Sequence, residues 1–240
     1  FRSMAAVGLL MRENPGLRNG GEIVFLMNPK FGVSDESRIR ARIDGETISL
    51  KMPAILDLQP ITDPEFYKVL CGGLRVPESA LKKPAYFAPR IRDLVVAFND
   101  PDVLLALDPD FPKLKKMATE GKYVHEGLMG TALSNIPGFD VINRVFLPGI
   151  DVNEDIACGS GNCSVIPYWA LKSGDFTGVS DFSVVYPYPP GGKGRVGGIQ
   201  RISLDTSLAQ ILLAGEASVG AATPLSLSKK SSAGISAPKK

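Results

Sequence analysis

Short strand-like segments outnumber helical ones in this chain, and few helices separate one strand from the next. The clearest strand pattern runs over residues 38–43, where arginines alternate with Ile39, Ala41 and Ile43. Alternation with a period of two is typical of a sheet that exposes one face to water. Asp44-Gly45-Glu46 then predicts a tight hairpin to a second strand over residues 47–52. Strands that follow one another in this way predict the α+β class.

The same patterns place the other elements. Further strands are expected at residues 22–27, 93–98, 127–133, 140–147, 182–186, 201–205 and 210–217, and helices at residues 3–12, 63–70, 101–107, 111–119 and 163–172. The turn at Asn14-Pro15-Gly16 is expected to end the first helix, and Gly72-Gly73 to end the second.

Two lobes and a tail are predicted. Residues 82–89 carry two prolines and are expected to connect the lobes. The N-terminal lobe then covers residues 1–85 and the C-terminal lobe covers residues 86–221. Residues 222–240 are rich in serine, proline and lysine and hold no aromatic residue, so we expect a disordered tail.

Composition excludes several classes of protein. The 27 basic and 25 acidic residues give a net charge of +2, which argues against a nucleic-acid partner. The longest apolar runs fall far short of the roughly 20 residues that a membrane span needs. Three cysteines without a disulfide-type spacing, and no visible secretory leader, predict a cytoplasmic location. One histidine and no cluster of cysteine and histidine predict no metal site.

The densest chemical signal runs from Val152 to Cys163 and opens an apolar helix. A serine flanked by glycines at a helix start leaves backbone N–H groups free at the positive end of the helix dipole, and such groups bind carboxylate or phosphate. Gly159, Ser160, Gly161 and Asn162 are therefore candidates for binding an anionic substrate. The alternative is that Ser160 only caps the helix.

Further hypotheses concern other residues near the start of this helix. The helix dipole predicts a lowered thiol pKa and a reactive Cys158, although most free cysteines are small buried hydrophobes. Asp155 is either an acid/base carboxylate or a turn-stabilising one. Cys163 lies about 140° from Cys158 on a helical wheel, so we expect no disulfide between them. Pro167 fits the helix only near its first turns.

A glycine-rich, basic stretch spans residues 187–198. Lys193 or Arg195 could hold an anionic substrate there, since mobile glycine loops beside a cleft often do so. The alternative is a plain hairpin loop. The stretch lacks the Gly-Lys-Ser/Thr end of a Walker A loop.

The block Asn153-Glu154-Asp155, Gly159-Ser160, Cys163 and Pro167-Tyr168-Trp169-Ala170, with the preceding strand from Asn143 to Gly149, resembles the PhzF-like phenazine-biosynthesis family of cofactor-independent isomerases. That family is similar in fold to diaminopimelate epimerase. The resemblance implies two pseudo-symmetric lobes, each a curled β-sheet or barrel around a central helix, with a ligand cleft between them.

The resemblance also implies roles for particular positions. Asp155 and Ser160 match a carboxylate and a hydroxyl that line the family's cleft, and Gly159 with the following amides matches the helix start that holds a substrate carboxylate. In the family, a first-lobe glutamate shuttles a proton and a histidine before the first central helix assists. Phe1 or Arg2 stands where that histidine is expected, so the first lobe is expected to be truncated. Either the native chain is longer, or a natively short chain has lost the proton shuttle.

Two residues bear on the alternative mechanisms. The segment from Ala157 to Gly161 is closer to the motif of epimerases and proline racemases than to the usual PhzF motif. In those enzymes a second thiol faces the thiol of the motif across the cleft. Cys71 is the only candidate outside the motif, and its setting at a helix end does not match the family's first thiol. His125 is expected to be a surface residue at a strand edge and not to replace the family's histidine.

These observations predict an isomerase or epimerase that moves a proton on a small carboxylated metabolite in a specialised biosynthetic pathway, without organic cofactor or metal. The alternatives are a non-catalytic binding or remnant homologue that lacks the first-lobe base, a thiol-dependent racemase that uses Cys158, and an enzyme whose cleft folds a reactive intermediate. The resemblance further implies a homodimer.

Overall fold

The computed structural model describes residues 7, 10–11, 13–26, 38–187 and 196–216. Its strands are β1 (Glu22–Leu26), β2 (Arg38–Asp44), β3 (Thr47–Pro53), β4 (Gln59–Ile61), β5 (Leu81–Ala88), β6 (Asp93–Phe98), β7 (Gly127–Leu133), β8 (Val141–Leu147), β9 (Val152–Asp155), β10 (Asp181–Pro187), β11 (Val196–Asp205) and β12 (Gln210–Glu216). They form one sheet in the order β1-β2-β3-β12-β11-β10-β8-β7-β6-β5-β4, and β9 pairs with β8 outside this path. The predicted hairpin is confirmed, since Asp44 of β2 pairs with Thr47 of β3.

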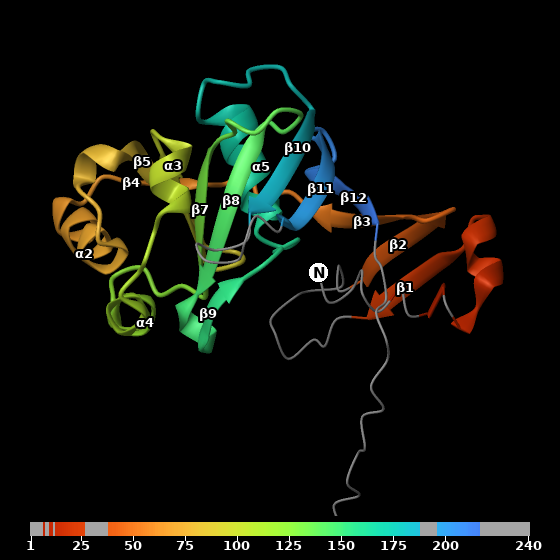
Figure 1. Ribbon diagram of the computed structural model, residues 1–240, viewed down its shortest axis with the longest axis horizontal. Coiled ribbons are helices and arrows are strands. Elements are labelled where there is room, and N and C mark those ends of the chain that lie inside the picture. Colours follow the sequence, from red (N-terminus) through yellow and green to blue (C-terminus); the bar gives the residue numbers. More distant parts are fainter. Residues whose placement is uncertain (1–6, 8–9, 12, 27–37, 188–195, 217–240) are drawn as a thin grey trace, which may run out of the picture.

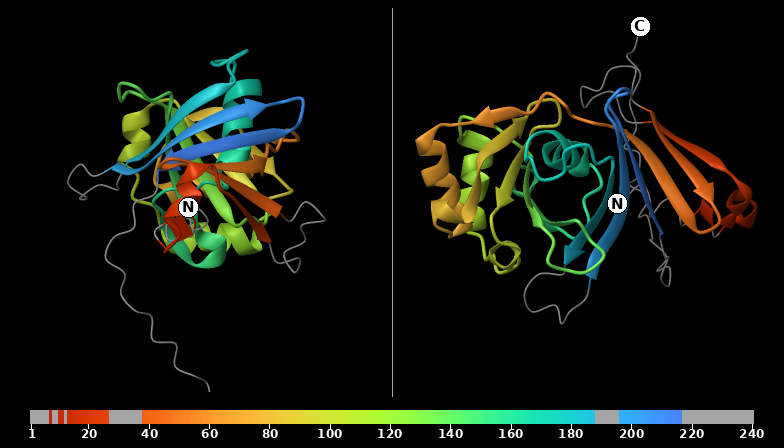
Figure 2. Two further views of the ribbon diagram at one scale, coloured as in Figure 1. Left: turned by 90° about the vertical axis from the view of Figure 1, so that its right-hand side faces the viewer. Right: turned by 90° about the horizontal axis from the view of Figure 1, so that it is seen from above.

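The sheet curls around one helix, α5 (Asn162–Leu171), while three other helices cover its outer face (Figures 1 and 2). These are α2 (Pro64–Leu74), α3 (Pro101–Leu105) and α4 (Phe111–Glu120), and the short 3-10 turns are η1 (Pro15–Asn19), η3 (Glu78–Ala80) and η4 (Pro148–Ile150). This arrangement confirms the α+β class. None of the helices in the described part of the chain is long and apolar enough to span a membrane.

Aspartates cap the three outer helices. The carboxylates of Asp63, Asp100 and Asp110 accept hydrogen bonds from backbone N–H groups in the first turns of α2, α3 and α4, at 3.1, 2.8 and 3.2 Å. Each helix also has a proline in its first two positions, where the missing N–H has no intrahelical acceptor.

Gly72 and Gly73 do not end α2, and that prediction is wrong. The helix continues to Leu74 and ends at Arg75, whose left-handed backbone (φ 58°) directs its N–H to the carbonyl of Cys71. Gly73 serves packing instead, because an added Cβ would come 2.6 Å from the Leu114 side chain of α4. The glycine therefore allows α2 and α4 to approach closely.

The stretch 82–89, which the sequence analysis expects to connect the lobes, is mostly a strand. Residues 82–88 lie in β5, which is antiparallel to both β4 and β6, and Pro89 follows its end. The pairing register of β5 shifts between Lys82 and Tyr86, and this irregularity accommodates Pro84.

Two apolar cores lie on opposite faces of the sheet. Side chains of β6 alternate between them, since Val95 and Ala97 pack on the α5 side whereas Val96 and Phe98 pack under the outer helices. Every residue of β6 is buried, as expected for a strand covered on both faces. The inner core contains Trp169, whose indole N–H donates to the hydroxyl of Thr131 at 2.8 Å.

Pro167 lies inside α5 rather than near its start, which corrects the sequence-based expectation. Proline has no N–H, so the carbonyl four residues earlier, that of Cys163, loses its helical partner. The backbone N–H of Ile55 donates to this carbonyl at 2.7 Å. The segment between β3 and β4 therefore replaces the missing bond and ties α5 into the fold.

The N-terminal part continues the same sheet beyond β12. Val7, Leu10, Met11 and Glu13 are helical, in agreement with the predicted first helix, and Val7 and Met11 are buried in the inner core. The predicted tail at residues 222–240 lies outside the described residues.

Candidate functional site

The predicted motif forms a tight turn between β9 and α5. Asp155 ends β9, is half-buried, and accepts a hydrogen bond from the backbone N–H of Ala157 at 3.1 Å. Such a bond from a carboxylate to the backbone two residues on is a turn-stabilising contact. It uses one oxygen of Asp155, so the turn interpretation of this residue and the acid/base interpretation are compatible.

The backbone around Gly161 shows how α5 begins. The N–H groups of Asn162 and Cys163 donate to the carbonyls of Gly159 and Ser160 at 3.2 and 3.0 Å, and the next two N–H groups share the carbonyl of Gly161. Gly161, not Ser160, is the capping residue, and no side chain caps the helix. The alternative in which Ser160 is only a cap is therefore wrong. Its side chain is exposed, and its hydroxyl lies 3.4 Å from the Cys158 sulfur.

Glycines allow this turn to lie close to the sheet. An added Cβ on Gly161 would come 2.5 Å from the sulfur of Met129 in β7. On Gly198 of β11 it would come 2.6 Å from the Cβ of Ala157. Gly198, at the end of the glycine-rich stretch, therefore packs against the turn. Lys193 and Arg195 of the same stretch lie outside the described residues.

Cys158 is buried, with 5% of its surface exposed. Burial raises the pKa of its thiol, and the hydrogen bonds from Ser160 and from the backbone of Gly161 offset this only in part. The direction is opposite to the predicted lowering of this pKa, because loss of water around the sulfur is the largest cause of the shift. Burial raises the pKa of Cys163 as well.

Asn162 belongs to a buried network of polar side chains. Its amide group donates to the Tyr186 hydroxyl at 2.7 Å and to the Gln200 side-chain oxygen at 2.6 Å. Its side-chain oxygen accepts from the amide of Asn143 at 3.0 Å. The residue is fully buried, so its side chain faces protein groups rather than an open ligand site.

The buried Arg144 and the partly buried Glu154 form an ion pair that the sequence analysis did not identify. Two nitrogens of the guanidinium donate to the two carboxylate oxygens of Glu154 at 2.8 and 2.9 Å. The remaining nitrogen donates to the carbonyls of Leu104, Leu105 and Leu107 at 3.2, 3.2 and 2.8 Å. The pair anchors β9 directly before Asp155. A charged residue within the apolar strand β8 was the available sequence signal.

Asp93 is another buried acid that the sequence analysis missed. It starts β6 on the side of α5 and is 7% exposed. Burial raises its pKa well above the ordinary value, and the charge of Glu126 adds to this effect. Its charge in turn raises the pKa of Cys158 and of Cys163.

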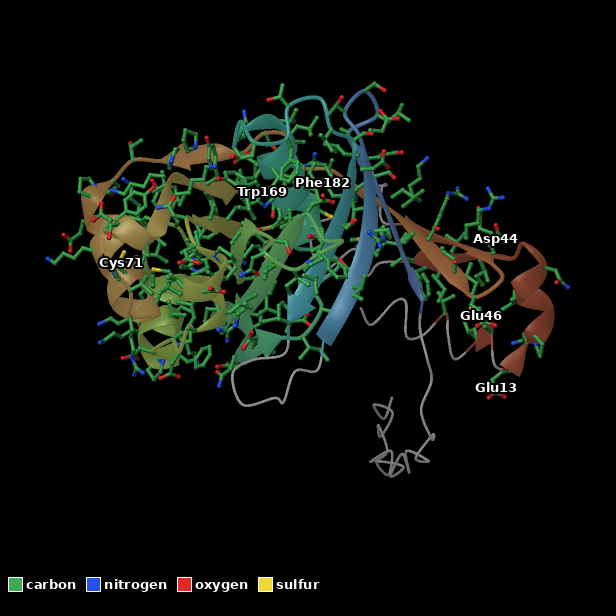
Figure 3. All side chains as sticks on the ribbon, turned by 45° about the horizontal axis from the view of Figure 1, so that its top comes forward. Glu13, Asp44, Glu46, Cys71, Trp169 and Phe182 are labelled. Carbon is green, nitrogen blue, oxygen red and sulfur yellow. The ribbon has the colours of Figure 1, made fainter. Side chains whose placement is uncertain are left out.

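The third cysteine lies on the other side of the sheet. Cys71 is on α2 and packs against the outer core (Figure 3), whereas Cys158 belongs to the inner core. The two thiols therefore do not face each other across a site. Within the described ranges, no group of three or more histidine, cysteine, aspartate or glutamate side chains is placed to hold a metal ion.

His125 is not a surface residue, which overturns the sequence-based expectation. It is 1% exposed, and its Nδ1 lies 2.8 Å from the Tyr123 carbonyl oxygen, where an N–H donor fits. Nε2 is buried without a hydrogen-bond partner in the part of the chain that the structure describes. Burial therefore lowers the pKa of His125 below its usual value of 6.5.

This lowered pKa predicts a loss of stability in mild acid. Below pH 6.5 the unfolded chain binds a proton at His125 that the folded chain does not, so stability falls as the pH drops. The loss is about 1.4 kcal/mol for each unit by which folding lowers the pKa. Urea unfolding at pH 7.5 and pH 5.5 measures it. The variant His125→Leu should lose this part of the pH dependence, and an unchanged dependence would contradict the assignment.

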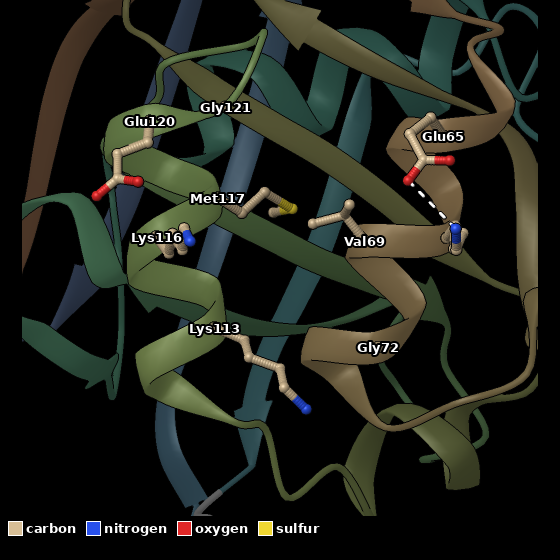
Figure 4. A pocket seen from close by; sticks show the side chains of 9 residues that line it. Glu65, Val69, Gly72, Lys113, Lys116, Met117, Glu120 and Gly121 are labelled. Carbon is tan, nitrogen blue, oxygen red and sulfur yellow. Dashed lines mark ion pairs between the residues drawn. The ribbon is translucent and has the colours of Figure 1, made fainter.

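A groove of about 500 Å³ lies on the outer face, away from these residues (Figure 4). It runs between α2 and α4, with Val69, Gly72 and Met117 among its apolar lining and Lys113 and Lys116 among its charged lining. None of the predicted site residues lines it.

Comparison with known proteins gives a consistent result. A family model described as PhzC-PhzF, phenazine biosynthesis-like protein, matches residues 63–222. An uncharacterized isomerase of Halalkalibacterium halodurans is 30% identical over 128 residues, which is 53% of this chain and 43% of that protein. One of Pseudomonas aeruginosa is 31% identical over 136 residues, which is 57% of this chain and 45% of that protein. The matches thus cover less than half of these curated relatives.

Solved structures show the same fold. A phenazine biosynthesis protein of the PhzF family from Enterococcus faecalis superposes with a TM-score of 0.64 at 21% identity, over 90% of this chain and 68% of that one. A putative PhzC/PhzF protein from Clostridium difficile gives a TM-score of 0.64 at 19% identity with the same coverage.

Proposed function

Because the chain belongs to the PhzC-PhzF phenazine biosynthesis-like family, we propose that it is an isomerase that moves a proton on a small carboxylated metabolite. The matched region contains the whole turn between β9 and α5. Two of the curated relatives that match are named isomerases. On the family resemblance we extend the proposal to a cytoplasmic homodimer in a specialised biosynthetic pathway.

The start of α5 is the proposed substrate site. The N–H groups of Gly159 and Ser160 precede the first helical hydrogen bonds, and the carbonyls of these two residues accept bonds from within the helix. The N–H groups are therefore available to bind a carboxylate at the positive end of the helix dipole. The exposed Ser160 hydroxyl adds a donor beside them.

Asp155 is the proposed acid/base group. Removal of a proton from a carbon next to a carboxylate sends negative charge onto the carboxylate oxygens. The N–H groups of the turn stabilise that charge as it develops, and each such donor contributes about 10²–10³ in rate. Asp155 is half-exposed at the same turn, so its free oxygen can take up or return the proton, with the Ser160 hydroxyl assisting.

The thiol alternative has less support. Cys158 is buried with a raised pKa, so the thiolate that a racemase needs is disfavoured, and Cys71 lies on the other face of the sheet. The single observation that carries the proposal is the turn itself, which places Asp155 and Ser160 at the start of an otherwise buried helix.

Deuterium uptake from D₂O tests the proposal. The protein is incubated with a panel of small unsaturated and hydroxylated carboxylic acids, and proton NMR monitors their C–H signals. One C–H signal next to the carboxylate or its conjugated system should exchange with the unmodified protein and with Cys158→Ser. Binding without exchange of any panel member would favour the remnant alternative, and loss of exchange only in Cys158→Ser would favour the thiol mechanism.

A further inference from the structure

The hydroxyl of Tyr186 lies at the centre of the buried polar network behind the proposed site. Tyr186 is in β10 and is 2% exposed. Its hydroxyl is 2.7 Å from the Asn162 amide nitrogen, 3.4 Å from that of Asn143 and 2.8 Å from the carbonyl oxygen of Cys158.

The directions of these bonds follow from a count of hydrogens. The Asn162 amide gives one hydrogen to Gln200 and one to the Tyr186 hydroxyl, and the Asn143 amide gives one to Asn162 and one to Tyr186. The hydroxyl therefore accepts from both amides, and its single hydrogen is left for the carbonyl of Cys158. Burial raises the pKa of Tyr186, so this hydrogen stays in place at neutral pH.

The bond to Cys158 orients the next N–H group. The peptide unit is planar and trans, so the C=O and the N–H of one unit point in opposite directions. Because the carbonyl of Cys158 points to the buried Tyr186 hydroxyl, the N–H of Gly159 in the same peptide unit points away from Tyr186. Gly159 is itself buried, and Ser160, the next residue, is exposed.

We propose that Tyr186 is a positioning residue that fixes the Cys158–Gly159 peptide, so that the N–H of Gly159 faces the substrate carboxylate, and that Asn143 and Asn162 hold Tyr186 in the orientation this requires. Asn162 then acts behind the site and not as a direct ligand. This inference rests on the proposed function, since it assigns a task to Tyr186 only if the start of α5 binds a carboxylate.

The variant Tyr186→Phe tests this role, with benzoate as the carboxylate probe and the amide signals of Gly159 and Ser160 as the NMR readout. Phenylalanine keeps the packing but removes the hydrogen bond to Cys158, so benzoate should bind roughly tenfold more weakly. The Gly159 signal should also move less at saturation. The matched control is Tyr168→Phe, because Tyr168 is equally buried at 2% but packs against Tyr86 and Trp169. Tyr168→Phe should leave both readouts unchanged.

A measurement on the unmodified protein covers the case in which Tyr186→Phe fails to fold. Exchange of the Tyr186 hydroxyl proton for deuterium should shift the carbonyl ¹³C signal of Cys158, and no shift would overturn the inference. Equal benzoate affinity in Tyr186→Phe and the unmodified protein would also overturn it. If benzoate moves neither signal in the unmodified protein, it is the proposed carboxylate site that fails.

Discussion

Replacement of Arg144 by methionine should destabilise the protein by about 3–5 kcal/mol, since the change leaves a largely buried carboxylate without its partner. The side chain of Arg144 is 3% exposed and that of Glu154 is 16% exposed, so water can replace the lost contact only in part. The change also removes the donor from three backbone carbonyls at the end of α3. Urea unfolding measures the free-energy difference.

An exposed ion pair provides the control for Arg144→Met. Arg75 pairs with Asp108 at 2.9 Å, but these side chains are 54% and 89% exposed. Exposed pairs of this kind contribute about 0–1 kcal/mol, so Arg75→Met should change the stability little. The double variant Arg144→Met with Glu154→Leu should recover part of the loss, because no unpaired charge remains. A loss in Arg144→Met no larger than that in Arg75→Met would contradict the assigned role.

Replacement of Asp155 by asparagine should reduce the rate of substrate deuterium exchange by about 10²–10⁴-fold, the usual range for loss of a general acid/base group. Asparagine retains a side-chain oxygen, so it can still accept the hydrogen bond from Ala157 and keep the turn. The effect should therefore fall on the exchange rate and not on the unfolding free energy. Proton NMR gives the rate, and urea unfolding gives the stability.

Asp151→Asn is the matched control for Asp155→Asn. Asp151 lies four residues earlier and is exposed, and within the described residues its ion-pair partner is the exposed Lys115. Exchange at the unmodified rate in Asp155→Asn would remove Asp155 from the mechanism. Equal losses in both variants would point to a general effect of charge near the site.

Elements with a strong local pattern were predictable from the sequence. The predicted bounds of β6 and β7 agree with the structure because apolar residues fill both strands and turn residues flank them. The short strands β4 and β9 were missed, since so few residues carry no recognisable pattern. Proline and glycine usually mark the ends of helices and strands, and this made two predictions differ from the structure. The prolines of residues 82–89 predicted a connection, but β5 contains Pro84 where its pairing register shifts. Gly72-Gly73 predicted a helix end, but Gly73 allows a close contact between two helices.

Residues of the candidate site were also predictable only where they lie close together in the sequence. Asp155, Cys158 and Ser160 are near neighbours in the sequence, so one motif brought them together. Tyr186 and Gln200 come from strands whose pairing with the rest of the sheet is not written in the local sequence, so their approach to Asn162 was not predictable. The direction of the pKa shift of Cys158 was not predictable for a related reason, since its largest cause is burial by segments distant in the sequence.

The most direct test of the central claim is a crystal structure of the protein with a carboxylic acid that it is found to exchange. We expect the carboxylate at the N–H groups of Gly159 and Ser160, with the exchanging carbon within reach of the Asp155 carboxylate. A substrate bound elsewhere, for example in the groove between α2 and α4, would contradict the proposed site.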